Sequence, residues 1–199
     1  MSMKGYLGGL VLIFIWAILT ACGSSNNLQE RTQFTHLDSL TDTYLVLQDS
    51  ALHAWNRVMK AEAEKTEALR YFVEQLDTLA QGGLMAALKS RIDQLERIRF
   101  TAKSVGNPDV ISEYDLACQS ILADLTHAAA THAHQPQVAG KLDWLQQLHA
   151  SIFSHRHYYD SVAEAFNQFV EQHAHELKEI ERNNHLERKP LFNTESTVR

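Results

Sequence analysis

Few of the residues that carry recognisable binding motifs are present in this 199-residue sequence. Two cysteines are too few for a disulfide scaffold or a cysteine-rich zinc module. Eight glycines, three of them within the first nine residues, leave little material for loops that bind phosphate groups. The formal charge of −6 provides none of the basic excess that is typical of nucleic-acid-binding proteins. These absences argue against several functional classes, and the composition points to a helical protein.

The residues that are present suffice for a folded core. Hydrophobic residues make up 45% of the chain and charged residues 21%, so a largely disordered protein is not expected. A length of 199 residues allows one ordinary domain or two very small ones. After the N-terminal region, long stretches without an alternating strand pattern separate the glycines and prolines.

The N-terminus has the parts of a secretory signal peptide. Lys4 provides a basic start, and an apolar run over residues 6–19 follows it. The run ends in Leu19-Thr20-Ala21-Cys22. This motif resembles the bacterial lipobox, which directs diacylglyceryl modification of a cysteine thiol and cleavage of the chain before that cysteine.

Residues 1–21 are accordingly expected to be a lipoprotein signal peptide, and residues 22–36 a lipidated Cys22 with a flexible tether. The alternative is an uncleaved membrane anchor, but residues 6–21 are short for a span, which takes about 20 apolar residues. A lipid anchor would hold the protein on the cell membrane or outer membrane, at the periplasmic or extracytoplasmic side. Gly23 rather than an aspartate follows the cysteine, which is similar to the sorting pattern of outer-membrane lipoproteins.

Four stretches with apolar residues at three- and four-residue steps predict four helices. We expect them at residues 37–81, at 84–103, from 108 to a loop at 131–136, and at about 138–182. The predicted fold class is all-α, an elongated antiparallel four-helix bundle with two long and two shorter helices. Residues 37–182 would form this bundle, and residues 183–199 would be a C-terminal tail.

Some positions within these helices can be assigned from the pattern. Asn107 is expected to be an N-cap, with Pro108 as the first helical residue. Residues 61–66 are small and charged, so we expect an exposed or weakly packed segment there. Trp55, Tyr159 and Phe166 are expected in the core, because aromatic residues at helical spacing usually lie there.

Four short motifs occur along the chain in a characteristic order. They are residues 44–58, which begin Tyr-Leu-Val-Leu and end Ala-Trp-Asn-Arg-Val, then Val-Glu-Gln-Leu at 73–76, Arg-His-Tyr-Tyr-Asp at 156–160 and Lys-Pro-Leu-Phe at 189–192. Together they resemble the LemA family of membrane-tethered bacterial helical proteins. The family's usual transmembrane helix is replaced here by the lipobox, and its Phe-Pro turn by Phe169-Val170-Glu171. The resemblance implies a helical bundle and a membrane location, with no established catalytic activity.

Histidine is the one enriched reactive residue, with eleven in the chain and nine of them from His127 onward. A helical metal site places two histidines four residues apart, so that both imidazoles face one ion. His132 and His134 are instead two residues apart, and at that spacing helical side chains diverge by about 200°. His127, His132 and His134 are the metal candidates, but solvated surface histidines are the better interpretation, and we expect no metal and no cofactor.

The remaining chemistry gives no sign of catalysis. Cys118 falls on the apolar face of its helix, so we expect a buried, inert thiol. No nucleophile elbow or oxyanion feature accompanies the acidic residues, so no catalytic residue is predicted and the protein is not expected to be an enzyme.

The sequence thus favours a membrane-anchored, non-catalytic interaction or scaffold protein of the bacterial cell envelope. Its expected partners are the membrane, through the lipid at Cys22, and an unidentified protein; nucleic acid is not expected, and the oligomeric state is left open. The alternative is a His-rich, metal- or pH-responsive envelope protein.

Overall fold

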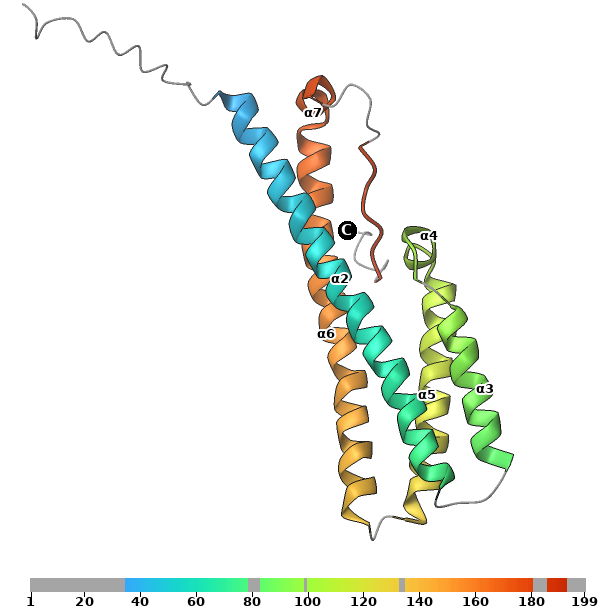
Figure 1. Cartoon of the computed structure of the whole chain (residues 1–199). Helices are drawn as coiled ribbons and strands as arrows, with labels where there is room; N and C mark the ends of the chain where they lie inside the picture. Colours follow the sequence, from blue (N-terminus) through green and yellow to red (C-terminus); the bar gives the residue numbers. More distant parts are fainter. Residues whose placement is uncertain (1–34, 79–82, 99, 133–134, 181–185, 193–199) are drawn as a thin grey trace, which may run out of the picture. The chain divides into compact units, whose positions relative to one another are not determined.

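The computed structural model describes residues 35–78, 83–98, 100–132, 135–180 and 186–192, and this part of the chain is helical with no strand. The all-α prediction is therefore confirmed. Among these residues, no helix combines the length and the apolar character that a membrane span needs. The helices belong to one compact unit that begins at His36. In chain order they are α2 (His36–Asp77), α3 (Gly83–Arg97), α4 (Ala102–Val105), α5 (Pro108–Ala130), α6 (Pro136–Gln172) and α7 (Ala174–Ile180) (Figure 1).

The two longest helices, α2 and α6, lie side by side and supply the faces on which the other elements pack (Figure 1). Val58, Leu69 and Leu76 are all within 1% of complete burial and lie on one face of α2. Leu145 and Ile152, seven residues apart, are equally buried on α6. Such stripes form because a residue three, four or seven positions along a helix returns to the same face.

Buried apolar side chains form three clusters along this pair of helices. The largest lies between α2, α3, α5 and α6 and includes Leu69, Leu88 and Ile121. A second joins the middle of α2 and α6 to α4, α5 and the extended residues 191–192. The third joins Tyr44 of α2 to the end of α6 and to α7. The α2–α6 pair therefore contributes to every part of the core.

Helix boundaries differ from the sequence prediction in three places. α2 ends at Asp77 rather than at residue 81, and the predicted helix at 138–182 is divided, since α6 ends at Gln172 and α7 begins at Ala174. The predicted helix at 84–103 is also divided, into α3 and α4. The cause of this second division is a capping box, in which the Thr101 Oγ1 accepts from the Ser104 N–H at 3.3 Å and the Ser104 Oγ accepts from the Thr101 N–H at 2.7 Å.

The predicted start of α5 is confirmed. The Asn107 Oδ1 accepts a hydrogen bond from the Asp109 N–H at 3.0 Å, which caps the helix, and Pro108 is the first helical residue. A proline is well tolerated there because the first backbone N–H groups of a helix have no partner within the helix. The sequence signal was sufficient at this point because both residues act locally.

One prediction about burial is wrong. Residues 61–66 were expected to be exposed or weakly packed, yet Ala61, Glu62, Lys65 and Thr66 are buried. Within the predicted C-terminal tail, residues 191–192 belong to the second core cluster. Of the expected core aromatics, Tyr159 and Phe166 are buried, whereas Trp55 is partly buried against the same cluster. Burial thus extends further in both places than apolar periodicity indicates.

The contrast between two leucines of α3 provides a test of the packing. Leu88 is 0% exposed and Leu84 is 46% exposed. We expect Leu88→Ala to lower the free energy of unfolding by about 2–5 kcal/mol, because it removes buried surface and leaves a cavity. Leu84→Ala is the matched control and should change it by about 0.5 kcal/mol or less. Urea unfolding followed by circular dichroism measures both, and equal effects would contradict this packing.

Candidate functional site

The most unusual feature of the described residues is a group of charged side chains inside the helical core. Glu62 is 6%, Lys65 1% and Arg156 5% exposed. Asp115, Tyr114 and Cys118 of α5 contact this group, and we call the six residues the ionic cluster. Charged residues are rarely buried to this extent unless they are paired.

The helical register places these charges where apolar residues would be expected. On α2, the positions Val58, Glu62, Lys65 and Leu69 follow one another at steps of four, three and four, so all four lie on the buried face. On α6, Arg156 comes four residues after Ile152 and three before Tyr159 in the same way. The two helices therefore carry their charges into the interface that holds them together.

Short hydrogen bonds join the charges of three helices. The Lys65 Nζ donates to the Glu62 Oε2 at 2.6 Å, and the Arg156 Nη2 donates to the Glu62 Oε1 at 2.6 Å. The Arg156 Nη1 lies 2.9 Å from both oxygens of Asp115. The Tyr114 hydroxyl donates to the Glu62 Oε2 at 2.9 Å. Both oxygens of the Glu62 carboxylate are thus partnered by donors from its own helix and from α5 and α6.

The ionic cluster is formally neutral, because two carboxylates face two cations. Burial by itself raises the pKa of Glu62, but the charges of Lys65 and Arg156 and their hydrogen bonds outweigh it, so the pKa lies below the ordinary value of 4.5. Burial lowers the pKa of Arg156, and the two carboxylates outweigh it, so that pKa is raised. Glu62 and Arg156 therefore favour their ionised forms in the folded protein.

Aromatic rings enclose the Arg156 guanidinium. Its central carbon lies 5.3 Å from the ring centre of Phe100, 5.7 Å from that of Phe153 and 5.1 Å from that of Phe192. Such cation–π contacts gain strength when the site excludes water. Phe192 lies near the C-terminus of the sequence, so a residue distant from the helices in the chain forms part of the cover over the ionic cluster.

The two remaining members of the ionic cluster are neutral groups. Burial raises the pKa of the Cys118 thiol, although the neighbouring Lys65, whose Nζ is 3.4 Å from the sulfur, acts in the opposite direction. Burial and the charge of Glu62 also raise the pKa of Tyr114. A thiol with a raised pKa is a poor nucleophile. The predicted burial of Cys118 is confirmed, at 0% exposed.

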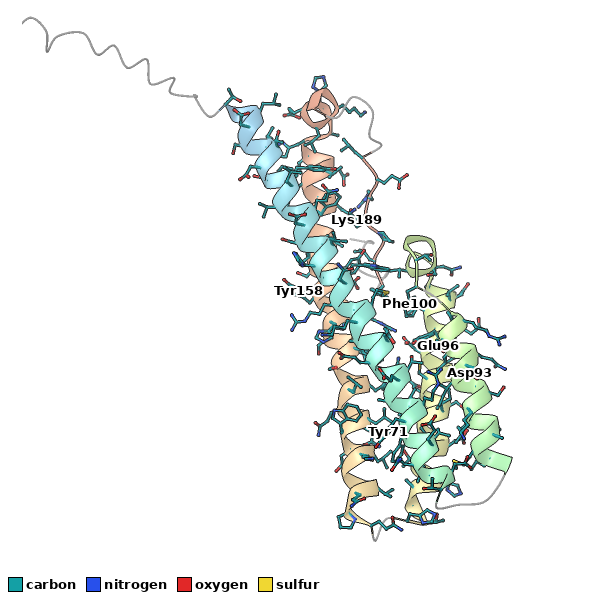
Figure 2. All side chains as sticks on the ribbon, in the orientation of Figure 1. Tyr71, Asp93, Glu96, Phe100, Tyr158 and Lys189 are labelled. Carbon is teal, nitrogen blue, oxygen red and sulfur yellow. The ribbon has the colours of Figure 1, made fainter. Side chains whose placement is uncertain are left out.

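A pocket of about 490 Å³ opens beside the ionic cluster, between α2, α3, Ile98 and Phe100. Glu62 and Tyr114 form part of its wall. At its rim the Arg70 Nη2 bonds to Glu96 at 2.6 Å and to Asp93 at 3.2 Å; both acidic residues are labelled on α3 in Figure 2. The rim charges are paired with one another, and they bind α3 to α2.

The second polar site of the protein holds its C-terminal residues 186–192, which we call the C-terminal segment. The Asn167 Nδ2 donates to the Lys189 carbonyl at 2.8 Å, and the Asn167 Oδ1 accepts from the Lys189 N–H at 2.6 Å. The Asp160 Oδ1 accepts from the Phe192 N–H at 2.8 Å. Asn167 is 4% exposed, so α6 presents a buried side-chain amide to the backbone of an extended segment.

The structure describes only some of the site residues that were predicted from the sequence. Cys22 and the lipobox residues Leu19, Thr20 and Ala21 lie outside the described residues, and so does His134. His127 and His132 are described, and no group of three or more His, Cys, Asp or Glu side chains that could hold a metal ion occurs in the described part of the chain.

The sequence analysis did not predict the ionic cluster or the side chains of α6 that hold the C-terminal segment. A signal for the first was present, because Glu62, Lys65 and Arg156 continue an apolar stripe without a change of step. A charged residue in such a position is compatible with a buried ion pair and with an exposed one. Which of the two forms depends on whether another helix supplies a partner. For Asn167 and Asp160 the apolar periodicity gave no comparable signal, although Asp160 falls within one of the four motifs.

Comparisons of the chain with protein-family models, with curated proteins and with solved structures find no match. The resemblance to the LemA family stays a prediction that depends on the four motifs. Two of those motifs coincide with the sites described above: Arg156 and Asp160 belong to one, and residues 189–192 are another.

Glu62→Gln tests whether the ionic cluster stabilises the fold. The substitution removes the only charge shared by Lys65 and Arg156 and leaves two buried cations with one carboxylate. We expect the free energy of unfolding at pH 7 to fall by about 3–5 kcal/mol, the usual cost of breaking a buried ion pair from one side. Glu64→Gln, which removes an exposed pair with Lys60 at 3.7 Å, is the matched control and should cost about 0.5 kcal/mol or less. Urea unfolding of the variants gives both values.

The pKa of Glu62 also predicts a pH dependence. Its folded-state pKa lies below the ordinary value of 4.5, so on acidification the unfolded chain binds the proton first. The stability contributed by Glu62 is therefore complete above about pH 4.5 and is lost as the pH falls through the folded-state pKa. Urea midpoints measured between neutral and acidic pH should converge for the wild type and Glu62→Gln as the pH falls. A constant difference between them would contradict the assignment.

Proposed function

We propose that the protein is a lipid-anchored, non-catalytic interaction or scaffold protein of the bacterial cell envelope. The observation that carries this proposal is the sequence Leu19-Thr20-Ala21-Cys22 directly after an apolar run of signal-peptide length. Cys22 would hold the protein at the periplasmic or extracytoplasmic side of the cell or outer membrane. Residues 23–36 would act as a flexible tether that lets the helices extend away from the membrane surface. Exposed helix faces would recruit a protein partner.

The helical part suits a role in presentation rather than in chemistry. We propose that α2, α3, α5 and α6 act as an elongated antiparallel four-helix bundle of the LemA type, with two long and two shorter members. The helix lengths support this arrangement, since α2 has 42 residues and α6 has 37, against 15 for α3 and 23 for α5. A scaffold of this kind raises the effective concentration of its partners at one membrane without strong pairwise affinity.

The chemistry of the buried groups supports a non-catalytic role. The Glu62 carboxylate accepts from three donors, and burial keeps the Cys118 thiol protonated. A catalytic acid, base or nucleophile needs an ionisation state that suits proton transfer or nucleophilic attack. Glu62 is held as a carboxylate with its oxygens occupied and Cys118 as a thiol, so neither group is in such a state. Their arrangement is suited to fixing the helices.

The two cysteines provide a matched test of the anchor. In cells grown with an alkyne fatty acid, Cys22→Ser should abolish lipid labelling of the protein, whereas Cys118→Ala should retain it. Intact-mass analysis of the membrane-extracted wild type should give a chain that begins at an acylated Cys22. A chain that begins at residue 1 or 2 without lipid would contradict the proposal and would make residues 6–21 a membrane anchor.

A further inference from the structure

The C-terminal segment is bound as an extended peptide along α6. Asn167 holds the backbone of Lys189, and Asp160 holds the backbone of Phe192, so the segment runs antiparallel to the helix. Asn167 and Asp160 are seven residues apart, which is about 10.5 Å along a helix axis. Lys189 and Phe192 are three residues apart, which is about 10 Å in an extended chain. The two spacings match, so α6 presents hydrogen-bonding groups at the correct interval for an extended backbone.

The side chains of the segment are held as specifically as its backbone. Phe192, 7% exposed, lies among aromatic rings, with its ring centre 5.6 Å from that of Tyr159 and 5.9 Å from that of Phe100. The Lys189 Nζ lies 5.1 Å above the ring centre of Phe166. Pro190 lies between the two backbone contacts and has no N–H that needs an acceptor. The groove therefore fits a basic residue followed three positions later by an aromatic one, and it accommodates a proline between them.

The groove that holds the C-terminal segment extends beyond the residues of that segment. A pocket of about 440 Å³, lined mainly by apolar side chains that include Leu52, Trp55 and Tyr159, runs beside Lys189 and Pro190. Leu52 is 56% exposed on the wall of this pocket. The segment thus lies along one side of this pocket, whose lining includes Lys189 and Phe100, both labelled in Figure 2. An extended chain can enter or leave such a groove from the side without unfolding the helices.

We propose that this groove is a peptide-binding site, and that its partner is the C-terminal segment of a second copy of the chain. Every copy carries both the groove and the sequence Lys-Pro-Leu-Phe that fits it, so exchange between two copies would recreate the same contacts. The proposal deepens the proposed interaction role, since it names the surface and the chemistry of its partner. Anchoring by Cys22 would favour exchange by concentrating copies at one membrane.

Complementation between two full-length variants tests the exchange. Asn167→Leu removes both hydrogen bonds between the groove and the Lys189 backbone but keeps the segment intact, and Phe192→Ala removes the aromatic side chain of the segment but keeps the groove. Each variant alone should be a monomer in detergent, and their mixture should contain a 1:1 heterodimer that native mass spectrometry resolves. The matched control is Asn167→Leu mixed with the double variant Asn167→Leu/Phe192→Ala, which has neither an intact groove nor an intact segment and should form no heterodimer.

A synthetic peptide of residues 186–192 tests the groove directly. It should bind the Phe192→Ala chain about tenfold or more tightly than the wild type, whose own segment competes at a millimolar effective concentration. The same peptide with alanine in place of its phenylalanine should not bind. Circular dichroism checks that Phe192→Ala is folded; if it is not, Lys189→Pro takes its place, which removes the N–H that bonds to Asn167 together with the ammonium above Phe166.

The outcomes separate cleanly. A heterodimer together with peptide binding supports the exchange. Absence of peptide binding at about 1 mM to a folded segment variant overturns the groove as a peptide site. Peptide binding without a heterodimer overturns the second copy as the partner and leaves the groove to the chain's own segment. None of these results bears on lipid attachment, which the labelling of Cys22 decides independently.

Discussion

Three buried charges and the half-buried Asp115 hold α2, α5 and α6 in one relative position, because the carboxylate of Glu62 receives its cations from two different helices. Charges taken out of water are costly unless each finds a partner, and a shift of one helix along another would separate these partners. A purely apolar interface tolerates such a shift more easily, since apolar contacts have little directional preference. The ionic cluster therefore does more than add stability. It fixes the register of the two longest helices where their stripes meet.

The C-terminal segment depends on the same constraint. Its Phe192 covers the Arg156 guanidinium, and the residues that hold its backbone lie on α6 just beyond Arg156. Any movement of α6 relative to α2 would change the group of aromatic rings that contacts Phe192. Trp55 comes from α2 and Tyr159 from α6, and their ring centres are 5.5 Å apart. The interior charges and the bound segment are consequently parts of one arrangement. Departure of the segment from its groove would uncover the Arg156 guanidinium, which Phe192 covers.

Much of the helical structure could be predicted from local sequence. The capped start of α5 at Asn107 and Pro108 and the burial of Cys118, Tyr159 and Phe166 all follow from residue types and three- or four-residue steps. The prediction failed where burial depends on a partner distant in the sequence. The small and charged residues 61–66 were expected to be exposed or weakly packed, but Glu62 and Lys65 are buried beside partners on α5 and α6.

The sequence by itself determined which stretches are helical and which faces are apolar, because both depend on neighbours within one or two turns. Only the tertiary structure decided what the polar residues on those faces do. Glu62 and Arg156 are 94 positions apart, and Asn167 and Lys189 are 22 apart, so no local pattern links them. A buried charge or amide is stable only beside its partner, and that partner is set by how the helices pack. The interior ion pairs and the peptide groove are therefore properties of the packed chain.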